Sequence, residues 1–277
     1  MLKDPSALRA ALRGTVLDGL PVREGPSRTI VVEGLPPERL LEGWRAARAA
    51  LSVTGRWPIA VSEATRAFPE CSGEELADFA AAVGRSRPWE VFRWHHHEGP
   101  AEAHEMTDWP FPDPSYAEAA TRELTMPVDW SDLDHWTYER VRTDSRIREQ
   151  LDEDLELYEG GRDWYTPRVV DLVFLPTEVP WMSAAWLSYW GAMECNPEAR
   201  VPFGAVLREW HEKWGAELVA CWDTMLQFVV SRTPAPGREA WDLERQIMTM
   251  AGSLQDPPWM RALALERTDT WFLHDRP

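Results

Sequence analysis

Histidines gather in one stretch of this chain and could provide ligands for a metal ion. His95, His96 and His97 are consecutive, and His104 follows seven residues later with acidic neighbours. Alternate residues of a strand lie on one face, so His95 and His97 would point the same way, and a carboxylate could complete a site. The polar end of a strand explains the same residues, and no HExxH motif accompanies them. We expect no cofactor, with His95, His97 and His104 as the metal-binding alternative.

A second histidine could support acid–base catalysis. His211 follows Trp210 on a predicted helix, one position away from its apolar stripe, and could act as a general base with Glu194 or Asp223. A half-buried structural histidine explains the same position. Cys195 is a candidate nucleophile, with a small buried residue as the alternative. The chain has no GxSxG, P-loop or GxGxxG motif, so hydrolase, NTPase and dinucleotide-binding sites lack their usual signatures.

Negative charge and aromatic side chains are concentrated in the middle of the chain. The net charge is -17, and residues 98–163 alone hold 6 basic and 19 acidic residues, a net charge of -13. Aromatic groups in an acidic field suit a basic protein partner, whose arginines can stack and pair, and the field disfavours nucleic acid. Alternatively, the aromatics pack inward and the acids only solvate the surface. The candidate binding residues are Trp109, Phe111, Tyr116, Trp130 and Trp136.

The composition is that of a protein with a large core. Hydrophobic residues make up 44% of the 277 residues, and tryptophan occurs 17 times, which predicts a tryptophan-rich core. The three cysteines are far apart without a CxxC motif, so we expect a reducing, cytoplasmic location rather than a disulfide framework. No apolar stretch is long enough for a membrane span, and the start of the chain lacks a signal-peptide pattern.

The predicted fold class is α+β, with mixed sheets packed by helices. In the N-terminal half, residues 29–33 and 57–61 are predicted strands on either side of a helix at 38–51. We expect this strand–helix–strand unit to be parallel because the connection between the two strands is helical. Another helix is predicted at 72–83, and a third strand at 90–94.

The middle of the chain separates the two predicted halves. Residues 98–130 are rich in proline and acids and are predicted to be irregular, whereas a helix should begin at a Ser131–Asp134 capping box. Two glycines at 160–161 end that helix. We therefore predict an N-terminal region at 1–160 and a C-terminal domain at 161–277.

The C-terminal half is predicted to form a strand, a helix, a hairpin and a further helix. Its first strand is a nearly continuous apolar run, which is typical of a strand buried on both faces. The hairpin turns at Asp223, a residue that suits a turn without any catalytic role. The predicted segments are a strand at 169–175, a helix at 202–214, a hairpin of 217–222 and 225–231, a helix at 238–254 and a strand at 270–273.

Several segments of this half also resemble sequence motifs of a known family: VVDLVFLPT, YWGAMECNP, LREWHEKWGAELV and the hairpin around Asp223. Together, from residue 169 to the C-terminus, they resemble the uncharacterised bacterial domain-of-unknown-function family 4253, which is common in actinobacteria. The upstream LLEGWRAARAA and GRWPIAV are similar to a region that often accompanies this domain. The resemblance implies an α+β fold and supplies no reaction.

The chain departs from the family pattern at two places. Ala192 and Met193 stand where the family has a Trp–Asn pair, and Gly204 or Ala205 stands where it often has a histidine. An activity carried by these positions would be absent from this chain.

These observations favour a protein that binds rather than catalyses. The concrete hypothesis is an interaction protein of the immunity type, which masks a basic toxin or nuclease with its acidic surface. One alternative is a hydrolase-like or metal-dependent enzyme that uses His211 or the His95–His97 cluster. Another is a structural subunit with exposed tryptophans as its contacts. A contiguous acidic, aromatic-bearing face would favour the first, and a pocket that joins two catalytic candidates would favour the second.

Overall fold

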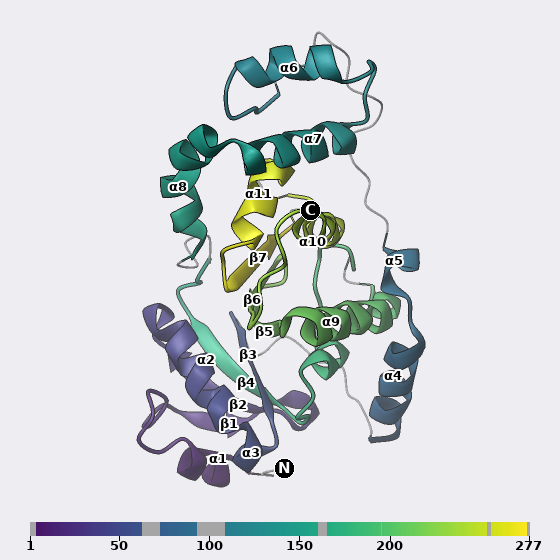
Figure 1. The fold of residues 1–277 in the computed structure, drawn as a ribbon. Helices are drawn as coiled ribbons and strands as arrows, with labels where there is room; N and C mark the ends of the chain where they lie inside the picture. Colours follow the sequence, from purple (N-terminus) through teal and green to yellow (C-terminus); the bar gives the residue numbers. More distant parts are fainter. Residues whose placement is uncertain are drawn as a thin grey trace.

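The computed structural model describes residues 4–62, 73–92, 109–159, 165–194, 196–253 and 256–275. Its strands form one mixed sheet in the order β1-β2-β4-β3-β5-β6-β7 (Figure 1). The strands are β1 (Val22–Glu24), β2 (Ile30–Leu35), β3 (Trp57–Val61), β4 (Val170–Leu175), β5 (Glu217–Cys221), β6 (Met225–Val229) and β7 (Thr270–His274). The α+β class with helices packed on a mixed sheet is therefore confirmed.

Strand β4 occupies the centre of the N-terminal part of the sheet. It pairs antiparallel with both β2 and β3, so these two run in the same direction with β4 between them. The expected parallel orientation of β2 and β3 is therefore confirmed, although the two strands are not direct neighbours. All six residues of β4 are buried, and such an apolar strand is most stable with a neighbour on each side. Strand β3 instead pairs in parallel with β5, through Ala60 and Ala220.

The sheet takes strands from both sides of the predicted boundary. Strands β1, β2 and β3 precede residue 160, and β4 to β7 follow it. The division into 1–160 and 161–277 stays a prediction about independent folding, and the glycines at 160–161 lie outside the described residues.

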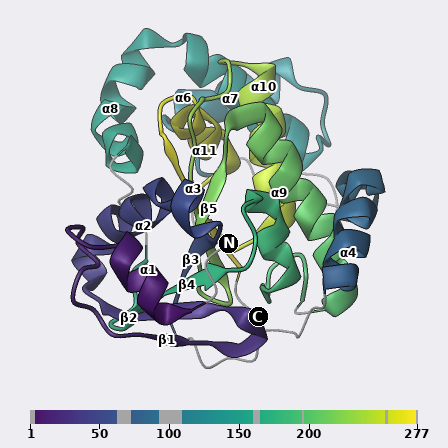
Figure 2. The same ribbon diagram turned by 90° about the horizontal axis from the view of Figure 1, so that it is seen from below.

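The helices form layers around this sheet (Figures 1 and 2). Helices α6, α7 and α8 lie at one end of the molecule, where α7 and α8 contact α11, while α2 packs on β3 and α4 packs on α9. The helices are α1 (Pro5–Ala11), α2 (Leu40–Ala49), α3 (Leu51–Thr54), α4 (Gly73–Arg85), α5 (Pro88–Val91), α6 (Ser115–Glu123), α7 (Trp130–Thr143), α8 (Ser145–Glu159), α9 (Arg200–Trp214), α10 (Arg238–Met250) and α11 (Pro258–Leu265). No helix in the described ranges is long and apolar enough to cross a membrane.

Three helices differ from the sequence-based expectation. Helix α5 stands where a strand was predicted, because Pro88 begins a helical turn and the Trp89 indole donates a hydrogen bond to Glu209 on α9, at 2.7 Å. Helix α6 lies in the stretch predicted to be irregular. Helix α7 is capped by Asp129, whose side chain accepts from the Ser131 amide, so the Ser131–Asp134 capping box is also wrong.

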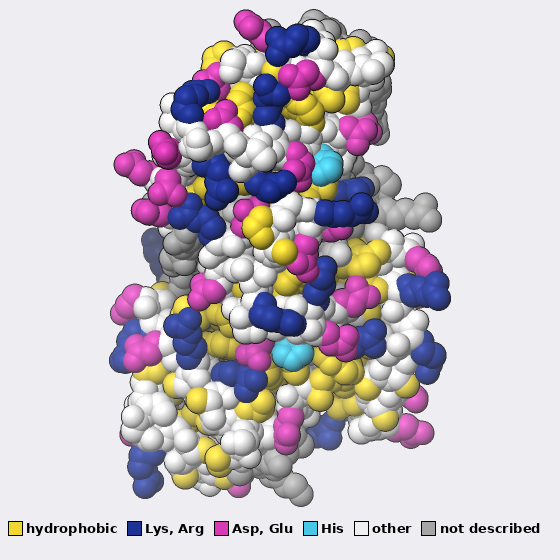
Figure 3. All heavy atoms as spheres, in the orientation of Figure 1, with side chains coloured by type: hydrophobic (Ala, Val, Ile, Leu, Met, Phe, Trp, Pro, Cys, Tyr) yellow, Lys and Arg dark blue, Asp and Glu magenta, His cyan; other side chains and the backbone are white. Residues whose placement is uncertain are grey.

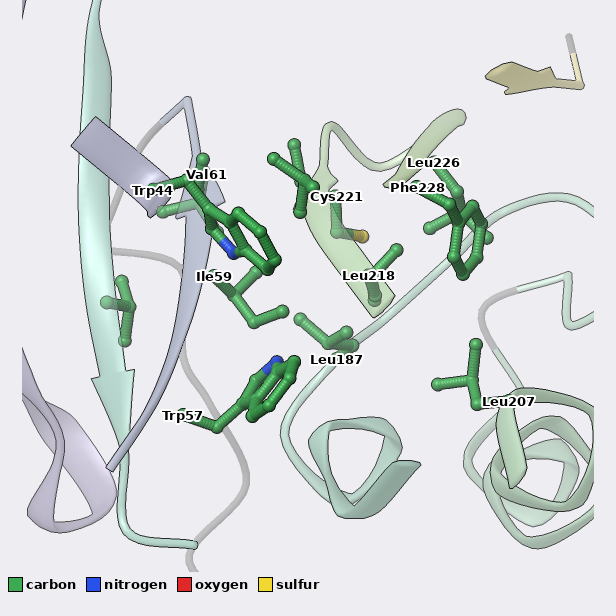
Figure 4. Close-up of a cluster of buried hydrophobic side chains, with 14 of the residues drawn as sticks. Trp44, Trp57, Ile59, Val61, Leu187, Leu207, Leu218, Cys221, Leu226 and Phe228 are labelled. Carbon is green, nitrogen blue, oxygen red and sulfur yellow. The ribbon is translucent and has the colours of Figure 1, made fainter. Parts of the chain in front are cut away.

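Tryptophans hold the main core together, as predicted. Among the described residues nine tryptophans are buried. Trp44 and Trp57 meet edge to face at 6.3 Å, and with Leu187 they point into the cluster that β5 and β6 complete (Figure 4). The Trp44 indole also donates to the Pro58 carbonyl at 3.0 Å, which fixes α2 on β3.

Candidate functional site

Helices α6, α7 and α8, here called the helical layer, carry three of the five aromatic candidates, and Trp109 and Phe111 lie in the segment before α6. The layer packs its apolar side against α10 and α11, with Tyr138, Ile147 and Leu155 buried among Trp241 and Trp259. These residues recur at helical spacing along α7 and α8, so burying them fixes which face of each helix looks outward. The opposite face of the layer is free for polar side chains.

The five aromatic candidates lie together, mostly turned toward the interior. Trp109 and Trp130 stack with ring centroids 4.4 Å apart, and both are half-buried. Phe111 and Tyr116 each meet Trp136 edge to face, at 6.5 and 6.2 Å. Tyr116 is buried, so four of the five keep some exposed surface.

One of the layer's own arginines already occupies the aromatic faces. The Arg140 guanidinium lies 5.1 Å from the Trp136 ring and 5.6 Å from the Tyr116 ring. It also pairs with Glu123 at 2.8 Å. The stacking that a partner's arginine would make at Trp136 is therefore made within the chain.

Ion pairs neutralise some acids of the helical layer but leave others without an ion pair among the described residues, including Glu118 on α6, Asp132 on α7 and several acids on α8. Four exposed residues of that helix make no ion pair with any described residue: Glu149, Glu153, Asp154 and Glu156. In Figure 3, acidic side chains gather at the edge of the molecule where Figure 1 places α8. The paired acids are Asp113 with Arg146, Glu123 with Arg140, Glu139 with Arg142, and Asp152 with Arg267. Residues 98–108 and 160–163 lie outside the described ranges.

The catalytic candidates lie at two different places. His211 is half-buried near the end of α9, where its Nδ1 lies 3.2 Å from the Ala216 carbonyl oxygen. Asp223 follows β5 in the hairpin turn with a positive φ of 65°, and its carbonyl accepts from the Trp190 amide at 2.7 Å. Ala216 and Asp223 flank β5, so at about 3.3 Å per residue they are on the order of 20 Å apart. The structure therefore does not bring His211 to Asp223.

Exposed Glu194 is linked to Asp223 by backbone hydrogen bonds through Trp190. The Glu194 amide donates to the Trp190 carbonyl, and the φ of Glu194 is 46°. The remaining candidates, Cys195, His95, His97 and His104, lie outside the described residues. Within the described ranges, no group of three or more His, Cys, Asp or Glu side chains could hold a metal ion.

A polar cluster at the ends of β5 and β7 was not predicted. The buried Tyr189 hydroxyl donates to the Met250 carbonyl at 2.9 Å, and Ser253 donates to Asp275 at 2.9 Å. Burial raises the pKa of Tyr189 well above its ordinary value, and the nearby charges of Asp275 and Cys221 act in the same direction. Tyr189 therefore stays a neutral donor that ties its loop to the segment after α10.

A second unpredicted feature is a buried charged cluster between α7, α10 and α11. Arg261 donates from Nε and Nη2 to Glu244 Oε1, at 2.9 and 2.5 Å, and Asp134 is buried nearby. Burial raises the pKa of Glu244 to about 7, the Arg261 charge opposes this rise, and the Asp134 charge adds to it. The sequence signal was a glutamate on the apolar stripe of α10, beside Leu243 and Ile247.

Comparison with known proteins finds a matching family for the C-terminal half. Residues 171–275 match the model of a family described as Domain of unknown function (DUF4253). The matched range includes β4 to β7 and α9 to α11, and it excludes the helical layer. No curated protein and no solved structure matches the chain. The C-terminal half is thus a match to DUF4253, as its resemblance predicted.

Proposed function

We propose that this chain is a cytoplasmic protein-binding module that recognises a basic partner through the outer face of α8. The observation that carries the proposal is the stripe of Glu149, Glu153 and Glu156, which is exposed and lacks ion pairs among the described residues, while exposed Asp154 lies on another side of the helix. The stripe lies on a helix whose other face is fixed by buried Ile147 and Leu155. It therefore presents its carboxylates in a defined direction.

The stripe lowers the stability of its own helix, which is an argument for a role outside the fold. Glu149 and Glu153 are separated by four residues, and Glu153 and Glu156 by three, so all three neighbour one another along one side of α8. Like charges at these spacings destabilise a helix by about 0.2–0.5 kcal/mol per pair. A basic partner that lies along α8 would remove this repulsion.

The half-buried Trp109–Trp130 pair supplies an apolar element on the same layer. Tryptophans of this kind form the centre of many protein interfaces, while charged groups at the rim accelerate encounter. The partner we propose is a basic protein with exposed arginines, and a toxin or nuclease masked by this chain is the concrete form. The same negative field works against nucleic acid.

Charge-neutralised variants with equal net charge test this proposal. The first variant is E149Q/E153Q/D154N/E156Q on α8. Its control, E24Q/E38Q/E74Q/D78N, neutralises four exposed acids far from the helical layer. The probe is a synthetic arginine-rich peptide, measured by titration calorimetry at low and moderate salt.

We expect wild type and the control to bind the peptide with a strong salt dependence. The α8 variant should lose about tenfold or more in affinity, because the three carboxylates of the stripe leave the contact. Equal losses in both variants would show that net charge alone attracts the peptide, and the proposal would fail. Equal binding by all three proteins would contradict it as well.

A hydrolase-like or metal-dependent enzyme and a structural subunit remain alternative hypotheses. The separation of His211 from Asp223 along β5 gives the first of these no support from the described residues. A hydrolase substrate panel on wild type and His211→Ala tests it directly. Turnover that disappears in this variant would favour the enzyme.

A further inference from the structure

Helices α10 and α11 lie between two separate apolar cores. On one side, Leu243 and Ile247 of α10 and Leu265 of α11 are buried in the main core, which contains the strands of the sheet. On the other side, Trp241 of α10 and Trp259 of α11 are buried with side chains of the helical layer. The two cores share no member among the described residues. The layer therefore packs on α10 and α11 and not on the core of the sheet, and Figure 1 shows α11 between α7 and β7.

The helical layer also has a small core of its own. Ala120 of α6, Leu133 of α7 and Val128 before α7 are buried together, and Trp109 and Trp130 pack against them. Helices α7 and α8 contact each other directly. The three helices are thus joined by contacts that do not involve α10 or α11.

Polar contacts attach the layer to the end of α11. Asp152 of α8 pairs with Arg267 at 2.6 Å, and the Tyr138 hydroxyl of α7 donates a hydrogen bond to Glu266 at 2.6 Å. Glu266 and Arg267 directly follow α11 in the chain. These contacts can break together when the layer moves away, and their loss leaves the pairing of the strands intact.

A buried ion pair keeps α10 and α11 together without the layer. Arg261 of α11 donates from Nε and Nη2 to Glu244 Oε1 of α10, at 2.9 and 2.5 Å. The two helices can therefore stay joined to each other and packed on the sheet when the layer is absent. The range that matches DUF4253, residues 171–275, likewise includes α10 and α11 and excludes the layer.

We infer that the helical layer is a cooperative unit that opens from α10 and α11 while the sheet stays folded. Contiguous elements of a protein open in this way at a free energy below that of global unfolding. Opening exposes Trp241 and Trp259, which are 4% and 3% exposed in the closed chain. The half that matches DUF4253 thereby gains an apolar face that the layer covers. The inference rests on the separate cores and does not depend on the binding role of α8.

Hydrogen exchange of the full chain, followed by mass spectrometry in increasing urea, tests the inference. In wild type, we expect the amides of α7 and α8 to be at least tenfold less protected than those of β4 and β6. Their protection should also depend less on urea, because opening exposes less surface than global unfolding. Equal protection and equal urea dependence in the layer and the sheet would overturn the inference.

Arg48→Met distinguishes opening of the layer from global unfolding. Arg48 joins α2 to Glu217 of β5, a contact that the closed and open states both keep. The variant should therefore lower the protection of β4 and β6 by about 5- to 30-fold and leave that of α7 and α8 unchanged. An equal loss in layer and sheet would show a single cooperative unit and contradict the inference.

Arg39→Met is the matched control, because it removes an exposed pair with Glu42 on the same helix α2. It should change the protection of layer and sheet by no more than about twofold. If Arg48→Met does not fold, the wild-type measurement decides: a urea dependence in α7 and α8 equal to that of β4 overturns the inference.

Discussion

The Arg48 guanidinium on α2 holds both carboxylate oxygens of Glu217 at the start of β5. Its Nε lies 3.2 and 3.0 Å from the two oxygens, and its Nη2 lies 2.7 Å from Oε1. Arg48 also lies over the Trp57 ring, at 4.7 Å from the centroid. One side chain thus joins the N-terminal helix α2 to β3 and to the first strand of the hairpin, within the range that matches DUF4253.

Replacing Arg48 by methionine should weaken this junction. Methionine keeps an apolar stem of similar length but removes the paired hydrogen bonds and the cation, and Glu217, whose side chain is only 17% exposed in the intact pair, loses its partner. We expect a loss of about 1–2 kcal/mol in the free energy of unfolding, measured with urea. Arg39→Met is the control, since its pair with Glu42 is more exposed, and it should change stability by less than about 0.5 kcal/mol. Equal effects would contradict the role of Arg48.

Gly204 allows α4 to approach α9 closely, and alanine at this position should destabilise the chain. A Cβ atom there would lie 2.9 Å from Val83 Cγ2 and 3.2 Å from Phe79 Cζ. Alanine favours a helix over glycine by about 1 kcal/mol, but crowding of this kind opposes it by about 1–3 kcal/mol. We expect a net loss near 1 kcal/mol by urea unfolding.

Gly252→Ala, in the turn after α10, is the control for an added methyl group without crowding, because nothing lies within 4 Å of its Cβ position. A Gly204→Ala protein at least as stable as wild type would show that α4 shifts away from the added methyl group at little energetic cost.

Strong local patterns were enough to predict much of the sheet. The bounds of β3 coincide with the prediction because Gly55 ends the preceding helix and an apolar run follows at once. The hairpin of β5 and β6 follows from Asp223, which tolerates the positive φ of the turn. The position of β4 between β2 and β3 was not predicted. An apolar run shows that a strand is buried, but it does not show which strands lie on either side of it.

The candidate site was harder to predict because distant helices decide it. Trp136 and Tyr116 turn inward since α10 and α11, more than 100 residues later, provide the apolar surface that covers them. The sequence shows the acids of α8 but not which ones Arg146 or Arg267 neutralise. Pairing of that kind depends on the folded arrangement of the helices.

Tyr138 links the helical layer to both ends of the α10–α11 unit, and its hydroxyl should contribute measurably to stability. It accepts from the Gly237 amide at 2.7 Å and donates to Glu266 at 2.6 Å. Tyr138→Phe leaves both partners unsatisfied, so we expect a loss of about 1–3 kcal/mol by urea unfolding.

Tyr116→Phe is the comparison, because that hydroxyl has one partner, Asp144, at 3.2 Å, and its loss should be smaller. Burial, with the Glu266 charge, raises the pKa of Tyr138 far above its ordinary value. The stability difference between Tyr138→Phe and wild type should therefore not change near pH 10, where a tyrosine ordinarily titrates. The opposite order of the two losses would contradict this account.

Trp210 couples the face of the sheet to α10, and the coupling is measurable by a double-mutant cycle. Its ring meets Phe228 and Trp271 edge to face, each at 5.6 Å, and its indole donates to Gln246 at 2.8 Å. Trp210→Phe should lower stability by about 2–3 kcal/mol, through lost packing and the lost hydrogen bond. Gln246→Leu should be destabilising alone, because it leaves the buried indole without its acceptor. In the Trp210→Phe background it should cost about 1 kcal/mol less. Additive effects would show that the hydrogen bond contributes nothing and that packing alone holds α9 against α10.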